Sequence, residues 1–324
     1  MGTITSTHPA RIKEMVPSKS KRTTRARSAD APGRRCSIIA NYCDTRCLVT
    51  RRAHSPRGEN RPPGDALICM RPLAVLALLC APAWAQTQCS QLMPCYTAAG
   101  LVNGAGFVPE LSPGALVSLF GTDLAWQSRS LTLHDQVPGL GGVQVLINGN
   151  MAVVLYISPL QVNFLVPPSL PPGPATVELL RDGAAGGPIS VTLKSYAPAL
   201  FLLEPNIAVA NRYPDWALAT RENPAAGGEI VTLWAAGLGR LERVVGDLDI
   251  PQEANQIAAR RQFRVLLNGI PLADEQILYA GCAPGYYGLY QINIKLPGHI
   301  DPYPEVRIAV GDFVSPPGVR LLAR

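Results

Sequence analysis

The chain has 324 residues, enough for two domains of ordinary size, and 47% of them are hydrophobic while 16% are charged. Its 29 Gly and 31 Pro favour short strands and many turns over long helices, and its apolar content is sufficient for a packed core. These values exclude a wholly disordered, collagen-like or coiled-coil chain. No uncharged apolar run reaches about 20 residues, which excludes a simple polytopic membrane protein.

The positive net charge comes from the first fifth of the chain. Residues 1–69 hold 14 Lys and Arg against 5 Asp and Glu, whereas residues 70–324 hold 15 against 18. A basic arm can bind nucleic acid, but neither interleaved aromatic residues nor a folded DNA-reading motif accompanies these charges, so we expect no nucleic-acid partner. Residues 1–69 are predicted to be a disordered basic leader, and the next segment indicates that they are an over-extended gene model.

A secretory signal peptide is predicted over residues 70–85. Met70 and one Arg are followed by an apolar run of about a dozen residues that ends in Ala83-Trp84-Ala85, with the small residues that signal peptidase accepts. The run is too short to span a membrane. We therefore expect translation to start at Met70 and cleavage to fall between Ala85 and Gln86. The mature protein is expected to be secreted or cell-envelope associated, without a transmembrane span.

The N-terminal segment of the mature chain, residues 86–98, carries two of its three cysteines. Cys89 and Cys95 are close enough in sequence for a small-loop disulfide in an oxidising compartment. Cys282 is left over, either as a buried thiol or as a partner for one of the other two. Too few ligand residues accompany these cysteines for a metal site, and no cofactor is predicted.

An internal repeat organises the rest of the chain. The matching segments are 114–125 with 228–239, 145–149 with 265–269, and 161–167 with 291–297. Their order is kept while their offset grows from 114 to 120 to 130, as in duplicated domains that differ by loop insertions. Two modules are therefore predicted, 99–198 and 199–324.

Each module is expected to consist of short strands separated by turns. In the first module the predicted strands are 115–120, 143–148, 151–157, 160–166, 175–181 and 188–194. Asn148-Gly149 and Asn268-Gly269 indicate hairpins, because both residue types tolerate the positive φ of a type I′ turn. Period-two alternation, with Phe164 facing one way and Asn163 the other, favours antiparallel β-sandwiches. The best helix candidate is the stretch 253–261.

The sequence from residue 101 onward resembles the Solibacter-type uncharacterised C-terminal domain family. The motifs that carry the resemblance are Pro113-Gly114 through Gly121-Thr122-Asp123-Leu124-Ala125, Gly141-Gly142-Val143 through Asn148-Gly149, Tyr156-Ile157-Ser158-Pro159 leading to Gln161-Val162-Asn163, Asn223-Pro224 through Gly237-Leu238-Gly239, and Ala283-Pro284-Gly285 leading to Gln291-Ile292-Asn293. The resemblance implies two tandem Ig-like β-sandwich domains in a secreted protein. Each half is also similar to IPT/TIG-type domains, which serve in binding or as spacers. The stretch 240–261 is more charged than this family implies, which leaves the details of that loop open.

Two polar pairs repeat between the modules. They are Gln161 with Asn163 and Gln291 with Asn293, on the polar face of one strand in each module. These amides either read a ligand or bond neighbouring backbone at a bulge or loop, and the second reading explains why the same choice occurs twice.

An aromatic loop in the second module is the other candidate binding feature. Tyr286 and Tyr287 lie where that module has extra residues. Exposed tyrosines on an end loop suit contact with a protein or glycan. The alternative is that at least one ring caps the core.

No catalytic residue is assigned. His134 and His299 lie in loop-like contexts without a neighbouring nucleophile motif, and no Gly-x-Ser-x-Gly occurs. We therefore expect a non-enzymatic pair of Ig-like modules for extracellular binding, adhesion or assembly, with a protein or glycan partner. A secreted hydrolase, or an accessory domain of one, is the alternative and needs an acid pair or triad that converges in one cleft. A purely structural spacer is a third reading.

Overall fold

The computed structural model describes residues 93–324 apart from 133 and 136, and these residues belong to one compact unit. The leader 1–69, the signal peptide 70–85 with its cleavage site at Ala85 and Gln86, and Cys89 lie outside the described residues, so what we predict for them stays a prediction. Across the described part of the chain, no helix combines the length and apolar character needed to cross a bilayer.

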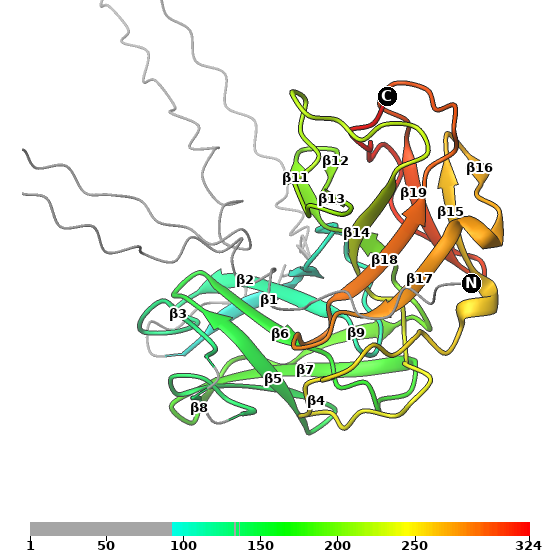
Figure 1. The fold of residues 1–324 in the computed structure, drawn as a ribbon. Helices are drawn as coiled ribbons and strands as arrows, with labels where there is room; N and C mark the ends of the chain where they lie inside the picture. Colours follow the sequence, from blue (N-terminus) through cyan, green and yellow to red (C-terminus); the bar gives the residue numbers. More distant parts are fainter. Residues whose placement is uncertain (1–92, 133, 136) are drawn as a thin grey trace, which may run out of the picture. The chain divides into compact units, whose positions relative to one another are not determined.

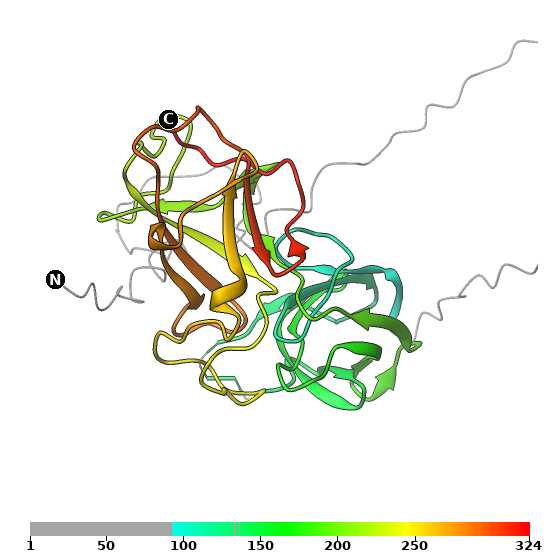
Figure 2. The same ribbon diagram turned by 90° about the vertical axis from the view of Figure 1, so that its right-hand side faces the viewer.

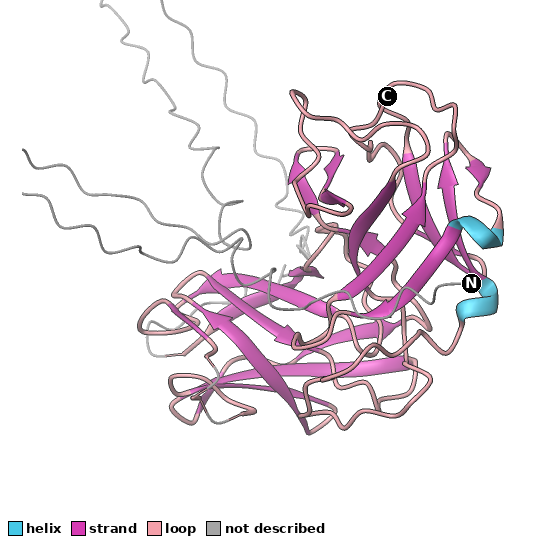
Figure 3. Cartoon of the chain, in the orientation of Figure 1, coloured by secondary structure: helices cyan, strands magenta, loops and turns pink. Residues whose placement is uncertain are grey.

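The described residues form β-strands joined by turns, with two short 3-10 helices (Figure 1; Figure 3). The strands of the first module are β1 (Cys95–Asn103), β2 (Leu116–Thr122), β3 (Arg129–Ser130), β4 (Val143–Ile147), β5 (Asn150–Ile157), β6 (Gln161–Leu165), β7 (Gly173–Arg181), β8 (Ala184–Ala185) and β9 (Ile189–Leu193). The elements of the second module are β10 (Ala199–Leu200), β11 (Leu202–Glu204), β12 (Ile207–Ala208), β13 (Ala210–Arg212), β14 (Ile230–Ala236), η2 (Arg260–Gln262), β15 (Phe263–Leu267), β16 (Ile270–Pro271), η3 (Asp274–Gln276), β17 (Ile277–Cys282), β18 (Tyr290–Lys295), β19 (Val306–Val310) and β20 (Phe313–Val314). All ladders between these strands are antiparallel, so the predicted all-β class of Ig-like antiparallel sandwiches is confirmed.

The first module, β1–β9, has two layers joined by one long strand. The strand order is β1-β2-β6-β5-β4-β7-β8, and β5 pairs with β4 through its first residues and with β6 through its last. Alternate side chains of these strands point between the layers. Val162, Phe164 and Leu179 are fully buried there. Phe164 therefore belongs to the core, as the alternation predicts.

The second module, β10–β20, has two main sheets that are separate. One has the order β10-β14-β18-β17 with β13 beside β14, and the other has the order β16-β15-β19-β20. Leu233, Ile292 and Ile308 are fully buried in its core. In Figure 2 the strands of the first module are coloured from cyan to green and those of the second from yellow-green to red. Each module thus buries an apolar core of its own.

Both modules use the same turn and the same bulge at corresponding places. Asn148-Gly149, between β4 and β5, has φ values of +50° and +78°, and Asn268-Gly269, between β15 and β16, has +49° and +79°. Both predicted hairpins are therefore confirmed. The register of β5 also slips by one residue opposite Asn163, and that of β17 slips in the same way opposite Asn293. The duplication thus extends to local backbone geometry.

The long segment between β14 and β15 differs from the prediction. The expected helix over 253–261 is wrong, because only η2 begins within it, at Arg260. The backbone runs beside β17 instead: Gln256 forms a β-bridge with Gly281, and the Cys282 amide donates to the Asn255 carbonyl at 2.9 Å. These contacts occupy backbone groups that a helix would need for its own hydrogen bonds.

The linker between β9 and β10, residues 194–198, packs tightly against the second module. Gly237 has a φ of +77°, and a Cβ at this position would lie 1.9 Å from the carbonyl oxygen of Ala197. Only glycine fits there, because both the conformation and the space exclude a side chain. The Nδ2 atom of Asn103 donates to the same carbonyl at 3.0 Å. A small buried cluster beside the linker consists of Ala105, Ala199 and Ala236.

Candidate functional site

A cavity of about 460 Å³ lies between loops of the two modules. The first module contributes Gly114, Leu165, Pro168 and Ser169, and the second contributes residues from the segments 239–251 and 282–290. Most of its walls are apolar, with a few polar groups among them, which is the usual composition of a ligand-binding cavity, and its volume falls in the usual range of roughly 300–1,000 Å³. We refer to it as the junction cavity.

One wall of the junction cavity is held to the first module by polar contacts. The guanidinium of Arg240 donates through Nε to the Pro168 carbonyl at 3.2 Å and through Nη2 to the Ser169 carbonyl at 3.0 Å. The carboxylate of Asp247 accepts from the Ser169 amide at 2.9 Å and from its hydroxyl. The loop that carries Arg240 and Asp247 is therefore fixed at both of these positions.

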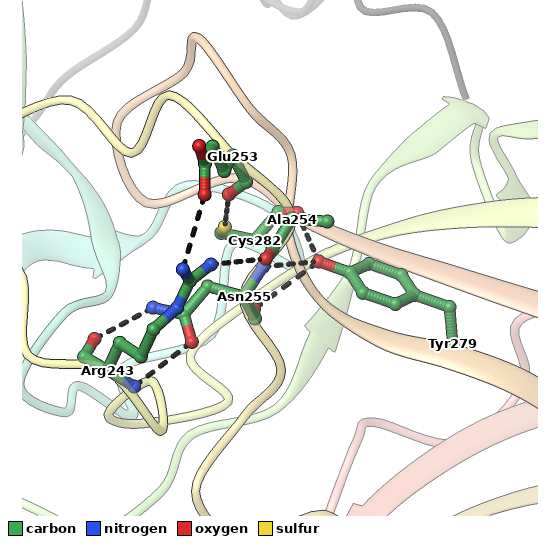
Figure 4. Close-up of polar contacts among 6 residues, drawn as sticks. All are labelled: Arg243, Glu253, Ala254, Asn255, Tyr279 and Cys282. Carbon is green, nitrogen blue, oxygen red and sulfur yellow. Dashed lines mark hydrogen bonds and ion pairs between the residues drawn. The ribbon is translucent and has the colours of Figure 1, made fainter. Parts of the chain in front are cut away.

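The far end of the same loop is fixed by a network around Asn255 (Figure 4). Asn255 accepts from the Arg243 amide through Oδ1 at 3.1 Å and donates to the Arg243 carbonyl through Nδ2 at 2.7 Å. The Asn255 amide donates to the Tyr279 hydroxyl at 3.2 Å, and that hydroxyl donates to the Cys282 carbonyl at 2.8 Å. The thiol of Cys282 donates to the Glu253 carbonyl at 3.4 Å.

Burial disfavours ionisation of the thiol and of the phenol in this network. It raises the pKa of the Cys282 thiol and the pKa of the Tyr279 hydroxyl. Cys282 is free and buried, so of the two readings left open for it the structure shows the buried thiol. Cys95 is disulfide-bonded, but Cys89 lies outside the described residues and its pairing with Cys95 stays a prediction. A protonated, buried thiol is a weak nucleophile, so Cys282 serves here as a wall and a hydrogen-bond donor.

The two candidate tyrosines of the aromatic loop have different positions. Tyr287 lines the junction cavity, and its hydroxyl donates to the Leu248 carbonyl at 2.9 Å. Tyr286 is not among the lining residues, and both rings are half-buried. The neighbouring Tyr290, on β18, is the ring that belongs to the core, and its hydroxyl donates to the Gly239 carbonyl.

The repeated amide pairs lie away from the cavity lining and bond within each pair. Nε2 of Gln161 donates to Oδ1 of Asn163 at 2.8 Å, and Nε2 of Gln291 donates to Oδ1 of Asn293 at 3.1 Å. Asn293 also accepts from the Thr232 hydroxyl at 2.9 Å. Each asparagine faces the bulge of the neighbouring strand, as described above. The amides therefore bond to other side chains, whereas the sequence predicted bonds to neighbouring backbone.

Several residues of the junction cavity were not singled out from the sequence. Leu165 was expected only as a strand residue, Arg240 only as a member of a charged stretch, and Asp247 as a solvated loop charge. Val244, which is 96% exposed, and the partly exposed Leu248 lie in the same loop. Two exposed apolar residues inside a charged loop were the available signal, and it is a weak one, because single exposed apolar residues are common on protein surfaces.

Comparisons with known proteins find only distant similarities. No protein-family model and no curated protein matches the sequence. Among solved structures, surface glycan-binding protein B of a Bacteroides ovatus mixed-linkage glucan utilization locus is 15% identical with a TM-score of 0.30, over 66% of this chain and 42% of that one. The I9–I11 tandem of titin is 10% identical with a TM-score of 0.20, over 66% and 62%. Domains 5–6 of the S-layer protein SbsC are 9% identical with a TM-score of 0.23, over 71% and 98%.

These similarities are too low to carry a function from those proteins to this one. The chain also spans less than half the length of the glycan-binding protein named first. The fold and the class of protein, an all-β chain with two Ig-like sandwiches in tandem, therefore rest on the strand pairing itself.

Proposed function

We propose that this chain is an exported, non-enzymatic binding protein that holds part of an extracellular partner in the junction cavity. The observation that carries the proposal is the cavity itself, which is built jointly by two modules and has mainly apolar walls with a few polar groups. The proposal includes membership of the Solibacter-type family, on the motifs given above.

The state of the polar groups supports binding rather than hydrolysis. Asp247 already accepts two hydrogen bonds from Ser169, and burial raises the pKa of Cys282. A hydrolase needs an acid and a base, or a nucleophile and a base, poised near neutral pH and aimed at one substrate atom. Arg240, Asp247 and Tyr287 instead hold the walls of the cavity in shape through their hydrogen bonds.

The mouth of the cavity indicates the chemistry of the partner. Val244 lines the cavity and exposes apolar surface, and the lining also includes the carboxylates of Asp247 and Asp249. A partner segment that presents an apolar group flanked by hydroxyl or amino donors matches this combination. A protein segment or a glycan can supply it.

Export is part of the proposal and has its own test. Mature protein is expected to begin at Gln86, and peptides from residues 1–69 recovered in the exported protein would overturn this start. Non-reducing mass spectrometry of the same material is expected to show Cys89 bridged to Cys95.

Filling the cavity tests the binding site. Val245 lines the cavity from a half-buried loop position, so Val245→Trp places an indole into the space without touching either core. Val314 lies on β20 and is 41% exposed, which makes Val314→Trp a matched control. We expect the exported protein to bind saturably to the cell-envelope fraction of the producing cells. Val245→Trp should weaken that binding at least about tenfold, equal to about 1.4 kcal/mol.

Two results would contradict the proposal. One is unchanged binding by Val245→Trp, and the other is the absence of saturable binding by the unmodified protein. Release of new reducing ends or peptide fragments from the envelope fraction, sensitive to Asp247→Asn, would instead support the hydrolase alternative.

A further inference from the structure

The first module also carries an exposed tryptophan, Trp126, that is held in place by two neighbouring side chains. Trp126 lies in the loop after β2 and is 65% exposed, more than the other exposed aromatic side chains among the described residues, Phe107, Tyr213 and Tyr303. Exposure of a single ring is ordinary. This ring, however, is held by both a cation–π contact and a hydrogen bond.

The indole of Trp126 is fixed on one face and at its edge. The guanidinium carbon of Arg181 lies 3.8 Å from the ring centroid, a cation–π contact. Arg181 is only 2% exposed and donates to the Asp123 carbonyl. Its guanidinium is therefore held in place against one face of the indole. The indole N–H donates to Oδ2 of Asp182 at 2.7 Å. The ring therefore holds one orientation, and its accessible area lies on the face away from Arg181.

The surroundings of the ring are polar. Four polar or charged residues adjacent to Trp126 in the sequence are exposed to solvent: Asp123, Gln127, Ser128 and Arg129. A stable protein–protein interface needs about 800 Å² from each partner, with an apolar centre of several residues. One flat ring inside a polar rim provides much less apolar area than that.

We propose that the open face of Trp126 is a stacking platform for a pyranose unit of a neutral polysaccharide. A pyranose ring has an apolar C–H face of about the size of an indole and a rim of hydroxyl groups. The C–H face can stack on the negative face of the aromatic ring, while the hydroxyl groups bond the surrounding carboxylates, amides and guanidinium. Because the indole is already immobilised, binding loses little side-chain entropy. This site is separate from the junction cavity.

Affinity gels of the full exported chain test the platform. Native gels are cast with mixed-linkage β-glucan, xyloglucan or dextran, and the unmodified protein is expected to be retarded by at least one of the three. Trp126→Ala should weaken retardation at least tenfold, and Trp126→Phe, which keeps a smaller ring without the N–H, should fall between the two. Tyr213→Ala, which removes an exposed ring from the second module, is the matched control and should not change retardation.

Fluorescence keeps the test decisive if Trp126→Ala folds poorly. The polysaccharide that retards the protein should shift its tryptophan emission, and the shift should be absent in Trp126→Phe. Val245→Trp should retain retardation, because the junction cavity takes no part in it. No retardation in any gel, or equal retardation of Trp126→Ala, would overturn the proposal. Loss by Trp126→Ala of binding to a protease-sensitive envelope component alone would also overturn it and mark the ring as a protein contact.

Discussion

Truncation of the two repeated asparagines should destabilise the protein by unequal amounts. Asn293→Ala leaves two donors without their acceptor, the Thr232 hydroxyl and the Gln291 amide, and Gln291 is only 3% exposed. An unpaired buried polar group costs about 1–3 kcal/mol, so a loss of unfolding free energy in that range is expected. Asn163→Ala removes the acceptor of Gln161 alone, which is half-buried and can turn to water. Its expected cost is about 0.5–1.5 kcal/mol.

Urea unfolding followed by circular dichroism measures these losses. Phe164→Ala sets the upper reference, because the ring is fully buried and its loss should cost about 3–5 kcal/mol. Gln144→Ala, at an exposed position of β4, is the control and should stay within about 0.5 kcal/mol of the unmodified protein. An Asn293→Ala variant as stable as this control, yet unable to bind the envelope fraction, would refute the structural role and turn the amide pairs into a ligand site.

Three further predictions concern single contacts. Arg212 donates two hydrogen bonds to the carboxylate of Glu229, at 2.9 and 2.7 Å, and holds the pKa of Glu229 below its ordinary 4.5. The pair should therefore stabilise the fold above pH 4.5, by about 1 kcal/mol because it is partly exposed. This contribution is lost as the pH falls through the lowered pKa of Glu229. Urea unfolding midpoints measured across the acidic range should show this loss for the unmodified protein and lack it for Glu229→Gln. Gly237→Ala should lower the melting temperature more than Gly149→Ala. Both glycines have positive φ, but only at Gly237 would an added Cβ clash with the backbone of the linker. Equal shifts of the melting temperature would contradict the packing described. Cys282 should react with iodoacetamide only after unfolding, since the thiol is buried and its pKa is raised, and mass spectrometry of the native protein would reveal any earlier alkylation.

Much of the β architecture follows from local sequence signals. The strands β2, β4, β5, β6, β7 and β9 begin and end within two residues of the predicted ranges, because period-two alternation and Asn-Gly turns are properties of a few adjacent residues. β1 was not predicted. It pairs with β2 through an irregular register and carries a run of exposed residues, so its pattern has no clear alternation.

The failed helix shows the limit of that reasoning. The stretch 253–261 has helix-forming residues, but Asn255 and Gln256 bond the edge of β17, a strand more than 20 residues further along the chain. Tertiary partners of this kind override local propensity, and a single sequence does not reveal them.

The site was less accessible to prediction than the fold. Tyr287 was chosen because exposed aromatic residues on loops often bind, and it does line the junction cavity. The cavity itself depends on how Arg240 and Asp247 of one module meet Ser169 of the other. No local sequence pattern predicts that these residues come together. Trp126 was missed for the same reason, since Arg181 and Asp182 that restrain it are distant in sequence.

Photocrosslinking at the mouth of the junction cavity tests the proposed binding function most directly. A benzophenone amino acid replaces Val244, which is 96% exposed, in full-length protein exported by its own cells, and the control carries it at Val314. Partner binding in the cavity predicts one discrete covalent adduct from position 244, absent from position 314 and abolished when Val245→Trp is added. No adduct, equal adducts at both positions, or an adduct that survives Val245→Trp would contradict it.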